Sequence, residues 1–157
     1  MSDDYDMNDL LQRVKHALEE MSWGFSESPD GPFLRMNWSG TNGFHSCFLQ
    51  VDDERPVISF YSQAQCRVPE EKRLAMAEFL NRANCKIWVG HFEVDFADGE
   101  VRYRTVLNIA DGVLTTRMLA ALMYPTVHTS DDYLPGIMGV VWNDLSAEDA
   151  IGLCDTE

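Results

Sequence analysis

Hydrophobic positions change their spacing several times along the chain, and each change marks a new element. Apolar residues recur every three or four positions over residues 7–21, which is typical of the buried face of a helix. Asp6 and Asp9 lie where acidic side chains favour a helix N-terminus. The pattern predicts a first helix that ends near Gly24, since glycine readily takes the left-handed conformation of a C-terminal cap. Residues 26–32 are rich in turn formers and predict a loop.

Alternating apolar and polar residues then predict three strands in succession. The expected strands cover residues 34–38, 44–51 and 57–62. A turn with two glycines at residues 39–43 separates the first two, and an acidic turn at residues 52–54 precedes the third. Consecutive strands on such short turns form an antiparallel meander.

A second helix and two further strands come next. Residues 69–84 predict a helix, because Pro69 suits a first helical turn and two glutamates come directly after it. Strands are expected at residues 87–96 and 101–109, on either side of Asp98-Gly99, which is a strong signal for a tight hairpin. The sheet would then have five strands.

The hairpin also predicts which charged residues face each other. A two-residue turn at Asp98-Gly99 places Glu93 opposite Arg104 and Asp95 opposite Arg102. These four charged residues are a candidate recognition patch, since guanidinium groups can hold a carboxylate or phosphate with two parallel hydrogen bonds. The alternative is a solvated sheet face with paired charges. The neighbouring arginines should lower the pKa of both carboxyl groups, which disfavours a general acid.

The C-terminal third is predicted to be helical but interrupted. Residues 116–123 predict one helix, and Pro125 and Pro135 are expected to break or kink the helical region beyond it. The sequence Ser-Asp-Asp at residues 130–132 is typical of a new helix N-terminus, for a run over residues 134–142.

The chain length and the element order together predict a single α+β domain. Ser146 and Asp149 resemble a capping box, which predicts a short tail helix within residues 146–154. The order is then α-β-β-β-α-β-β-α with that tail, in one domain over residues 1–157 whose core spans residues 7–143. We expect a five-stranded, mainly antiparallel sheet with helices packed on one face and a partly wet opposite face.

The charge balance excludes several classes of partner. The chain has 12 basic and 26 acidic residues, a formal net charge of −14, so nucleic acid and anionic lipid would be repelled. The first residues are polar and acidic, unlike an export signal. No apolar run approaches the roughly 20 residues that cross a bilayer. We therefore expect a cytoplasmic protein without a nucleic-acid or membrane partner.

Residues that could carry catalysis or hold a metal are dispersed. The four cysteines form no CxxC pair and are expected to be reduced thiols. His45 and Cys47 share a strand face, but no second pair of ligands accompanies them, so a core or edge histidine is favoured over a zinc site. Neither a glycine-rich phosphate loop nor a set of nucleophile and base is recognisable. The sequence thus predicts no enzyme, no cofactor and no metal site.

The predicted C-terminal helices are apolar on more than one side. Such helices must be buried in the core, in a dimer or in the groove of a partner. Met138 and Trp142 are candidate contact residues in this region, because methionine suits an adaptable surface. Burial in the protein's own core is the alternative.

Several stretches resemble the YbjN-like family of bacterial proteins. They are VPEEKR at residues 68–73, EFLNRAN at 78–84, VGHFEVD at 89–95 and DGEVRYR at 98–104. The resemblance extends more weakly from the first helix to about Trp142. It implies the fold of the type III secretion chaperones, whose element order agrees with the one above. It also implies a small bacterial binding protein, described as a regulator of sensory transduction, with no catalytic residues to carry over.

These observations favour a non-enzymatic protein-binding module, either chaperone-like or a regulatory adaptor. Secretion chaperones are small, acidic and commonly dimeric, so we expect a homodimer that holds a protein partner through a sheet edge or the C-terminal helix. The alternative function is a sensor of a small molecule. Its pocket would lie between the sheet and the C-terminal helix, lined by Trp38, Phe48, Phe60 and Trp88.

Overall fold

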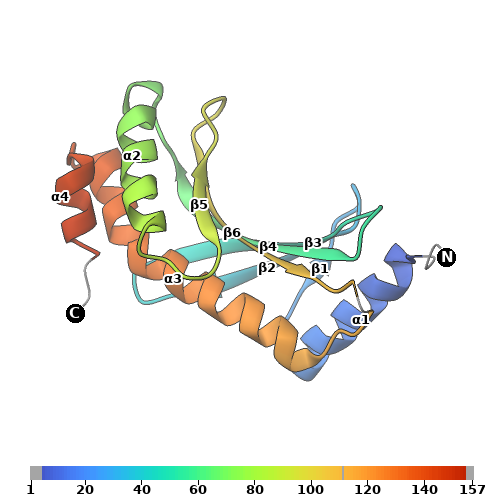
Figure 1. Ribbon diagram of the computed structural model, residues 1–157. Helices are drawn as coiled ribbons and strands as arrows, with labels where there is room; N and C mark the ends of the chain where they lie inside the picture. The colour runs from blue at the N-terminus through green and yellow to red at the C-terminus, as the bar shows by residue number, and fades with distance from the viewer. Residues whose placement is uncertain (1–4, 111, 155–157) are drawn as a thin grey trace.

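The computed structural model describes residues 5–110 and 112–154. They form one antiparallel sheet with helices on a single face (Figure 1). The elements are α1 (Met7–Glu20), β1 (Ser26–Glu27), β2 (Phe33–Ser39), β3 (Phe44–Val51), β4 (Val57–Arg67), the 3-10 turn η1 (Glu70–Lys72), α2 (Arg73–Asn84), β5 (His91–Val94), β6 (Glu100–Asn108), α3 (Thr116–Trp142) and α4 (Ala147–Gly152).

The sheet curls away from its helices. Its strand order is β1-β2-β3-β4-β6-β5, and every neighbouring pair is antiparallel. β4 carries an irregularity between Gln63 and Arg67, where its register with β6 shifts, and such bulges bend a strand. Figure 1 shows the β5–β6 hairpin rising out of the plane of β2 and β3, so that the face without helices becomes concave.

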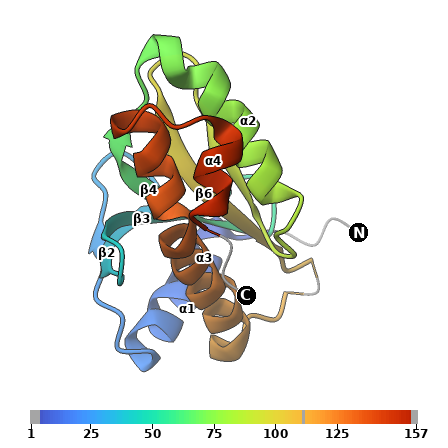
Figure 2. The ribbon, with the colours of Figure 1, turned by 90° about the vertical axis from the view of Figure 1, so that its left-hand side faces the viewer.

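The helix α3 joins two hydrophobic clusters. One cluster lies between α1, the strands β2 to β4 and the first half of α3, and includes Leu49 and Leu119. The other lies between α2, α4, the β5–β6 hairpin and the second half of α3, and includes Phe79 and Ile137. In Figure 2, α2 and α4 lie side by side at the upper end of the molecule, with α1 below. The C-terminal apolar residues are therefore mostly core.

The sheet has six strands, so the prediction of five was wrong. The additional strand β1 falls within the expected loop and pairs with β2, with Ser26 opposite Arg35. A strand of two residues shows no alternation, which left no signal in the sequence. Its turn is closed by the backbone N–H of Ser28, which donates to the carbonyl of Phe33 at 2.9 Å.

β4 and β5 differ most in length from the prediction, β2 is one residue longer at each end, and β3 matches its expected range. β4 continues to Arg67 instead of ending at residue 62, because alternating burial persists over the added residues. β5 covers only residues 91–94, because Gly90 has a φ of +76° and interrupts the extended backbone before it.

The first helix ends earlier than predicted and without glycine. Ser22 takes the left-handed conformation, with a φ of 56°, in place of Gly24. The N–H of Trp23 then donates to the carbonyl of Leu18 at 2.9 Å, as in a Schellman motif. Serine is not a typical residue for such a cap. The sequence pattern therefore predicted that the helix ends at the nearest glycine.

The sequence left open whether the C-terminal region is one kinked helix or two; it is one helix, because α3 runs through both prolines, so the expected break is wrong. Pro135 has no N–H for the carbonyl of Asp131, and the side-chain amide of Asn42 donates to that carbonyl instead, at 3.0 Å. Pro125 has no N–H to donate to the carbonyl of Ala121. Both residues lie on the exposed side of the helix, where water can donate to that carbonyl instead. Residues 130–132 are thus in the middle of a helix and do not begin one.

The short tail helix is confirmed as α4. Ser146 is its N-cap, and its hydroxyl accepts from the N–H of Asp149 at 3.1 Å. This contact belongs to the capping box that the sequence predicted.

The turn between β5 and β6 is longer than predicted, which changes the charge pairs. Glu93 faces Arg102 and not Arg104, while Asp95 lies beyond the last residue of β5. The partner of Glu93 thus lies two residues earlier on β6 than predicted. A register shift of two keeps each side chain on its face of the sheet, so the expected charged face is correct although its pairs were not.

Asp95 causes the longer turn. Its carboxylate accepts from the N–H of Ala97 at 2.7 Å, and its own N–H donates to the carbonyl of Glu100 at 2.8 Å. Four residues then form the loop, with Gly99 in the left-handed region at a φ of +77°. Aspartate bonded to nearby backbone in this way favours a wider turn than Asp98-Gly99 alone indicates.

Candidate functional site

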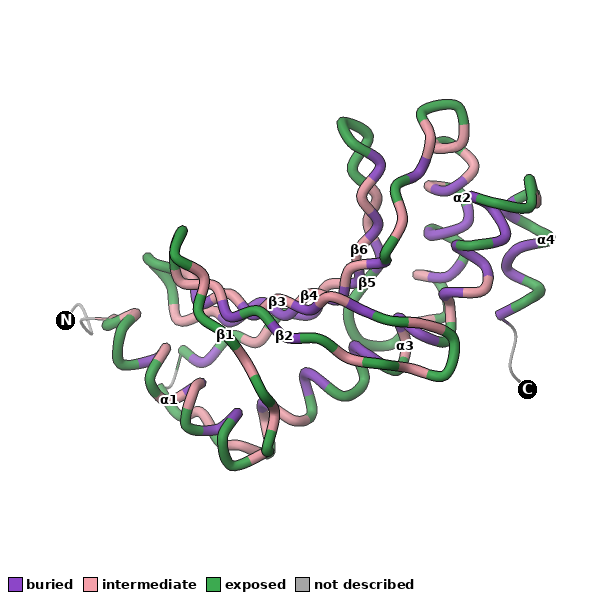
Figure 3. Tube along the Cα trace, turned by 180° about the vertical axis from the view of Figure 1, so that it is seen from behind, coloured by how far each residue is buried: buried purple, intermediate pink, exposed green. Residues whose placement is uncertain are grey.

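The concave face of the sheet has no helix over it (Figures 1 and 3). Burial alternates along the strands, with fully buried residues on the helix side and half-buried residues on the open side. The uncovered face carries half-buried aromatic side chains, and apolar surface grouped on one face of a protein can mark an interaction site. They mark this open face as the candidate site.

A single row of residues crosses the open face from strand to strand. Arg35 on β2 is paired with Phe48 on β3, and Phe48 is paired with Tyr61 on β4. Tyr61 is paired with Arg104 on β6, which faces His91 on β5. Directly paired residues on one face lie about 4.5–5.5 Å apart, so the two aromatic side chains are neighbours between two arginines. We call Arg35, Phe48, Tyr61 and Arg104 the central row.

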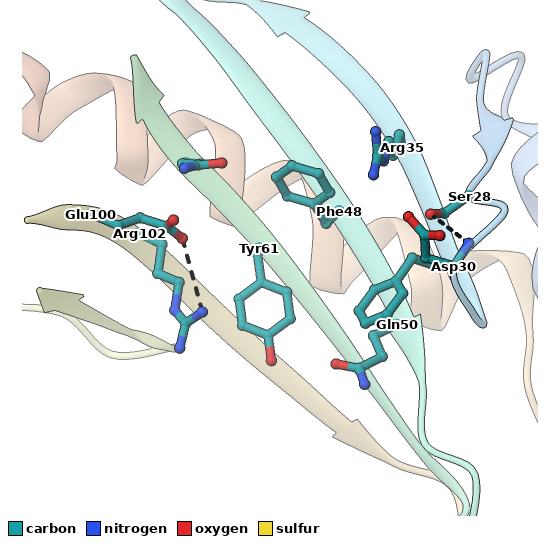
Figure 4. A pocket seen from close by; sticks show the side chains of 10 residues that line it. Ser28, Asp30, Arg35, Phe48, Gln50, Tyr61, Glu100 and Arg102 are labelled. Atoms are coloured by element: carbon teal, nitrogen blue, oxygen red, sulfur yellow. Dashed lines mark hydrogen bonds and ion pairs between the residues drawn. The ribbon is translucent and has the colours of Figure 1, made fainter. Parts of the chain in front are cut away.

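A cavity of about 400 Å³ lies over this part of the sheet. Figure 4 shows Phe48 and Tyr61 next to each other in it, with Arg35 and Arg102 on opposite sides. Ser28 and Asp30 close the cavity at the β1–β2 turn. The lining residues are Ser28, Asp30, Phe33, Arg35, Phe48, Gln50, Tyr61, Gln63, Glu100 and Arg102.

Arg102 is held by acidic partners. Its Nε donates to a carboxylate oxygen of Glu93 at 2.8 Å, and Nη1 is 3.9 Å from Glu100. Burial acts to lower the pKa of Arg102, but the hydrogen bond to Glu93 outweighs it and the pKa is raised. The guanidinium carbon also lies 5.2 Å from the centre of the Tyr61 ring. Arg102 is thus held in place and charged where it lines one side of the cavity.

The arginines at the ends of the central row are different. Among residues 5–110 and 112–154, neither Arg35 nor Arg104 takes part in an ion pair. The guanidinium carbon of Arg104 is 5.5 Å from the Tyr61 ring centre, and its Nε is buried without a hydrogen-bond partner. A buried donor without an acceptor is costly, which leaves Arg104 ready to bind an anionic group.

The predicted site residues are brought together only in part. Glu93, Arg102 and Arg104 lie side by side on the open face. Asp95 instead organises the hairpin turn. Met138 and Trp142, 41% and 65% exposed, lie on α3 on the helix side of the sheet, away from the arginines. Sequence reasoning missed Arg35 and Tyr61 as members of the site and expected Phe48 in a different pocket, because only the pairing of β4 with β6 places Tyr61 beside Arg104.

Both edges of the sheet are blunted. The outer edge of β5 is occupied by Asn84, whose side-chain amide donates to the carbonyl of Phe92 at 3.0 Å and accepts from the N–H of Phe92 at 2.7 Å. The other edge is β1, which has two residues. Covered or very short edge strands resist the addition of another strand. Partner binding at a sheet edge is thus disfavoured.

The Asn84→Ala variant should lose both of these hydrogen bonds and leave the Phe92 backbone unpaired. We expect it to lower the free energy of unfolding by about 1–3 kcal/mol. Asn81→Ala is the control, since Asn81 is exposed on the same helix. Urea unfolding of both variants, with hydrogen exchange at the Phe92 amide, measures the effect. Equal stability of the two variants and unchanged exchange would contradict the role given to Asn84.

A buried polar cluster lies on the opposite side of the sheet, between the two hydrophobic clusters. Nε2 of His45 is 3.0 Å from Oδ1 of Asp131, and Nδ1 is 3.3 Å from the hydroxyl oxygens of both Ser62 and Ser130. Ser62 donates to Ser130 at 2.9 Å. All four side chains are at most 4% exposed. The preference for a core histidine at His45 is confirmed.

Asp131 also fixes the turn between β2 and β3. Its carboxylate accepts from the backbone N–H groups of Thr41 and Asn42, at 2.8 and 3.1 Å. The cluster contains a hydroxyl, an imidazole and a carboxylate, as in a serine hydrolase. Because a substrate cannot reach side chains buried this deeply, we interpret the cluster as a structural link between α3 and the sheet.

The stability of this link should depend on pH. Burial acts to raise the pKa of Asp131, but the hydrogen bonds from His45, Asn42 and Thr41 lower it below its ordinary value of 3.8. A lowered folded-state pKa contributes stability that is present above the unfolded pKa and is lost as pH falls through the folded value. We expect the stability advantage of the wild type over Asp131→Asn to shrink as the pH falls below about 4. Urea unfolding across this range tests the expectation, and an advantage that grows on acidification would contradict it.

The four cysteines are free thiols, and two of them lie in surroundings that disfavour the reactive thiolate. Burial raises the pKa of the Cys47 thiol to about 12, although the hydrogen bond with Ser62 acts to lower it. Burial also raises the pKa of Cys66. Within the described part of the chain, no three His, Cys, Asp or Glu side chains gather so as to hold a metal ion.

The aromatic residues expected to line a single pocket lie in different places. Phe60 is fully buried in the core, and Trp38 packs against that core next to His45. Trp88 is 98% exposed in the loop before β5. Phe48 alone of the four lies in the cavity of the open face. Trp88 lines a separate cavity of about 330 Å³ between that loop and α3, so the four residues do not share one pocket.

The fold and the site define a small α+β domain with an uncovered, concave sheet face. The family model for YbjN, described as "Putative bacterial sensory transduction regulator", matches residues 10–137. The chain therefore belongs to the YbjN family, as the sequence motifs indicated. This family assignment identifies the chain as one of a group named for regulation and not for catalysis.

A solved structure supports the fold. The crystal structure of YbjN from E. coli, titled "a putative transcription regulator", is similar with a TM-score of 0.61 and 16% sequence identity. The similarity covers 85% of this chain and 89% of that one. No sequence among the curated proteins matches the chain. Among the described residues, no helix combines the length and apolar character needed to cross a membrane.

Proposed function

We propose that this YbjN-family protein is a non-enzymatic regulatory domain that binds a partner protein on the open face of its sheet. The observation that carries the proposal is the central row, in which two half-buried aromatic residues lie between two arginines that form no ion pair with any described residue. Aromatic residues and arginine dominate the binding energy of protein interfaces. The protein has a formal net charge of −14, so a surface on which arginines and aromatic residues are grouped stands apart from the rest of the molecule.

The site favours contact through side chains over the addition of a strand. Asn84 covers one sheet edge and β1 is short, so backbone groups for pairing are scarce. The open face instead offers a hollow with ordered walls, because Arg102 is fixed by Glu93. A rigid surface loses little conformational entropy on binding.

Capture of the partner by two matched variants tests this function. Tagged wild type, Tyr61→Ala and Trp142→Ala are used to capture proteins from a lysate of the source organism, with quantitative mass spectrometry. A protein enriched by the wild type should fall about tenfold or more with Tyr61→Ala and stay unchanged with Trp142→Ala. Circular dichroism and thermal melting confirm that both variants fold. Loss with Trp142→Ala alone would move the interface to α3 and overturn the proposal.

A small-molecule sensor is the second candidate, because a cavity of about 400 Å³ is within the range of ligand pockets. A ligand that binds only the folded protein must raise its melting temperature. A compound whose stabilising effect disappears in Tyr61→Ala would favour this candidate. The homodimer expected from the sequence stays a prediction, which light scattering over a concentration series tests.

A further inference from the structure

The charges on the open face point to the chemistry of the partner. We propose that the open face binds an extended acidic segment of the partner, in which an aromatic or other apolar residue lies midway between two acidic residues, two positions from each. This inference rests on the proposed function and adds the class of ligand to it.

The first argument is the state of the two end arginines. Most other arginines of the sheet region are neutralised: Arg67 binds Asp98 at 2.8 Å and Glu100 at 3.0 Å, and Arg102 binds Glu93. Arg35 and Arg104 lack such partners in the described chain, and the buried Nε of Arg104 has no acceptor. In a chain with 26 acidic residues, two arginines on one face without carboxylate partners favour carboxylates supplied by a ligand.

The second argument is the spacing along the central row. Arg35 and Arg104 are separated by three steps between neighbouring strands, from β2 to β6, which span about 14 Å. In an extended peptide, residues i and i+4 point to the same side about 13 Å apart. Two acidic side chains at that spacing can therefore each reach one of the arginines at the same time.

The same geometry places the middle residue. Residue i+2 of the peptide points to the same side as i and i+4 and lies halfway between them. Halfway between the arginines the sheet presents Phe48 and Tyr61. An apolar or aromatic side chain there would bury its surface against two rings, which adds stabilisation beyond the charge pairs. The intervening residues point away from the sheet and are unrestricted.

A peptide also fits better than a nucleic acid. Two arginines on a surface of net charge −14 cannot offset repulsion of a polyphosphate chain. Asp30 and Glu100 line the cavity as well, and they would repel phosphates lying over it. A segment with only two carboxylates, each placed on an arginine, is repelled less by them than a phosphate chain, although Asp30 beside Arg35 still opposes one of the two. Asp30 therefore gives a second, opposite test of the charge pattern.

Fluorescence anisotropy with defined peptides tests the inference. The probe is a short labelled peptide containing Glu-Ser-Phe-Ser-Glu, and the control peptide has the same composition in the order Glu-Phe-Ser-Ser-Glu. A second control replaces both glutamates with lysine. We expect the probe to bind about tenfold more tightly than either control, with an affinity that falls as salt is added.

Four variants locate the binding on the protein. Arg35→Gln and Arg104→Gln should each weaken the probe about tenfold, and Asp30→Asn should strengthen it. Arg82→Gln is the matched control, since Arg82 is exposed on α2 and its loss changes the net charge equally. Three of the substituted residues are exposed and Arg104 is half-buried, so thermal melting is used to confirm that each variant folds.

The outcomes separate this inference from the proposed function. Absence of probe binding, equal binding of the three peptides, or no effect of Arg35→Gln and Arg104→Gln overturns the acidic-segment assignment. If partner capture still depends on Tyr61 in that case, the open face remains an interface for a segment of other chemistry. If capture is also independent of Tyr61, the proposed function fails as well.

Discussion

Replacing Asp131 by alanine is expected to lower the free energy of unfolding by about 3 kcal/mol or more, because each donor left without its acceptor in the protein interior costs roughly 1–3 kcal/mol. The carboxylate serves three donors that would lose their acceptor together: the imidazole of His45 and the N–H groups of Thr41 and Asn42. His45 is fully buried and has no access to water in compensation. Because Asp131 joins α3 to the β2–β3 turn, its loss should loosen both.

Asp132→Ala is the control for this variant. Asp132 is the next residue of α3, carries the same charge and is exposed. Its replacement should change stability by no more than about 0.5 kcal/mol. Urea unfolding of both variants and the wild type measures the difference. If Asp131→Ala is as stable as Asp132→Ala, the buried cluster does not hold the helix to the sheet.

Replacing Gly99 by alanine is expected to cost about 3 kcal/mol or more. An alanine at a φ of +77° is disfavoured by about 1–2 kcal/mol. Its Cβ would also lie 2.2 Å from the carbonyl oxygen of Val68, a backbone atom that cannot move by rotating a side chain. The hairpin would have to shift and weaken the hydrogen bond from the Val68 N–H to the Gly99 carbonyl, now 2.8 Å.

Gly112→Ala separates the two contributions. Gly112 has a similar φ of +73°, but among the described residues no atom outside its chain neighbours lies within 4 Å of a Cβ added there. It should cost only the conformational penalty of about 1–2 kcal/mol. Chemical unfolding of both variants gives the comparison. Equal losses would show that close approach to Val68 does not constrain the hairpin.

Periodicity predicted most of the sheet because burial on one side imposes strict alternation. β3 follows it without interruption and was predicted to its end residues, whereas β1 is too short to carry a pattern. The charged face of the β5–β6 hairpin was predicted correctly even though the turn was not, since Asp95 lengthens the turn by two residues and an even shift preserves the face.

The errors in the helices arise from contacts distant in sequence. Pro135 should end a helix by local rules, but Asn42 supplies the hydrogen bond to Asp131 that the helix lacks. Asp131 itself has the local signature of a helix start, and its partner His45 lies 86 residues away. Such polar contacts across the core override local propensity and leave no periodic signal.

The candidate site was only half predictable for the same reason. Arg102 and Arg104 were recognised as a charged face within one hairpin. From the sequence, Phe48 and Tyr61 could equally be core residues. An aromatic residue in a strand does not indicate which face of the sheet the helices cover. Their position beside Arg104 depends on the pairing of β4 with β6, two strands that are not consecutive.

Site-specific photo-crosslinking tests most directly whether the open face is the interface. A photoreactive phenylalanine is placed at Gln63 on the open face, at Leu74 on α2 or at Trp142 on α3, and each protein is irradiated in a lysate of the source organism. We expect one partner protein to be crosslinked from Gln63 and from neither helix position. Crosslinks to a partner from Leu74 or Trp142, with none from Gln63, would contradict binding on the open face.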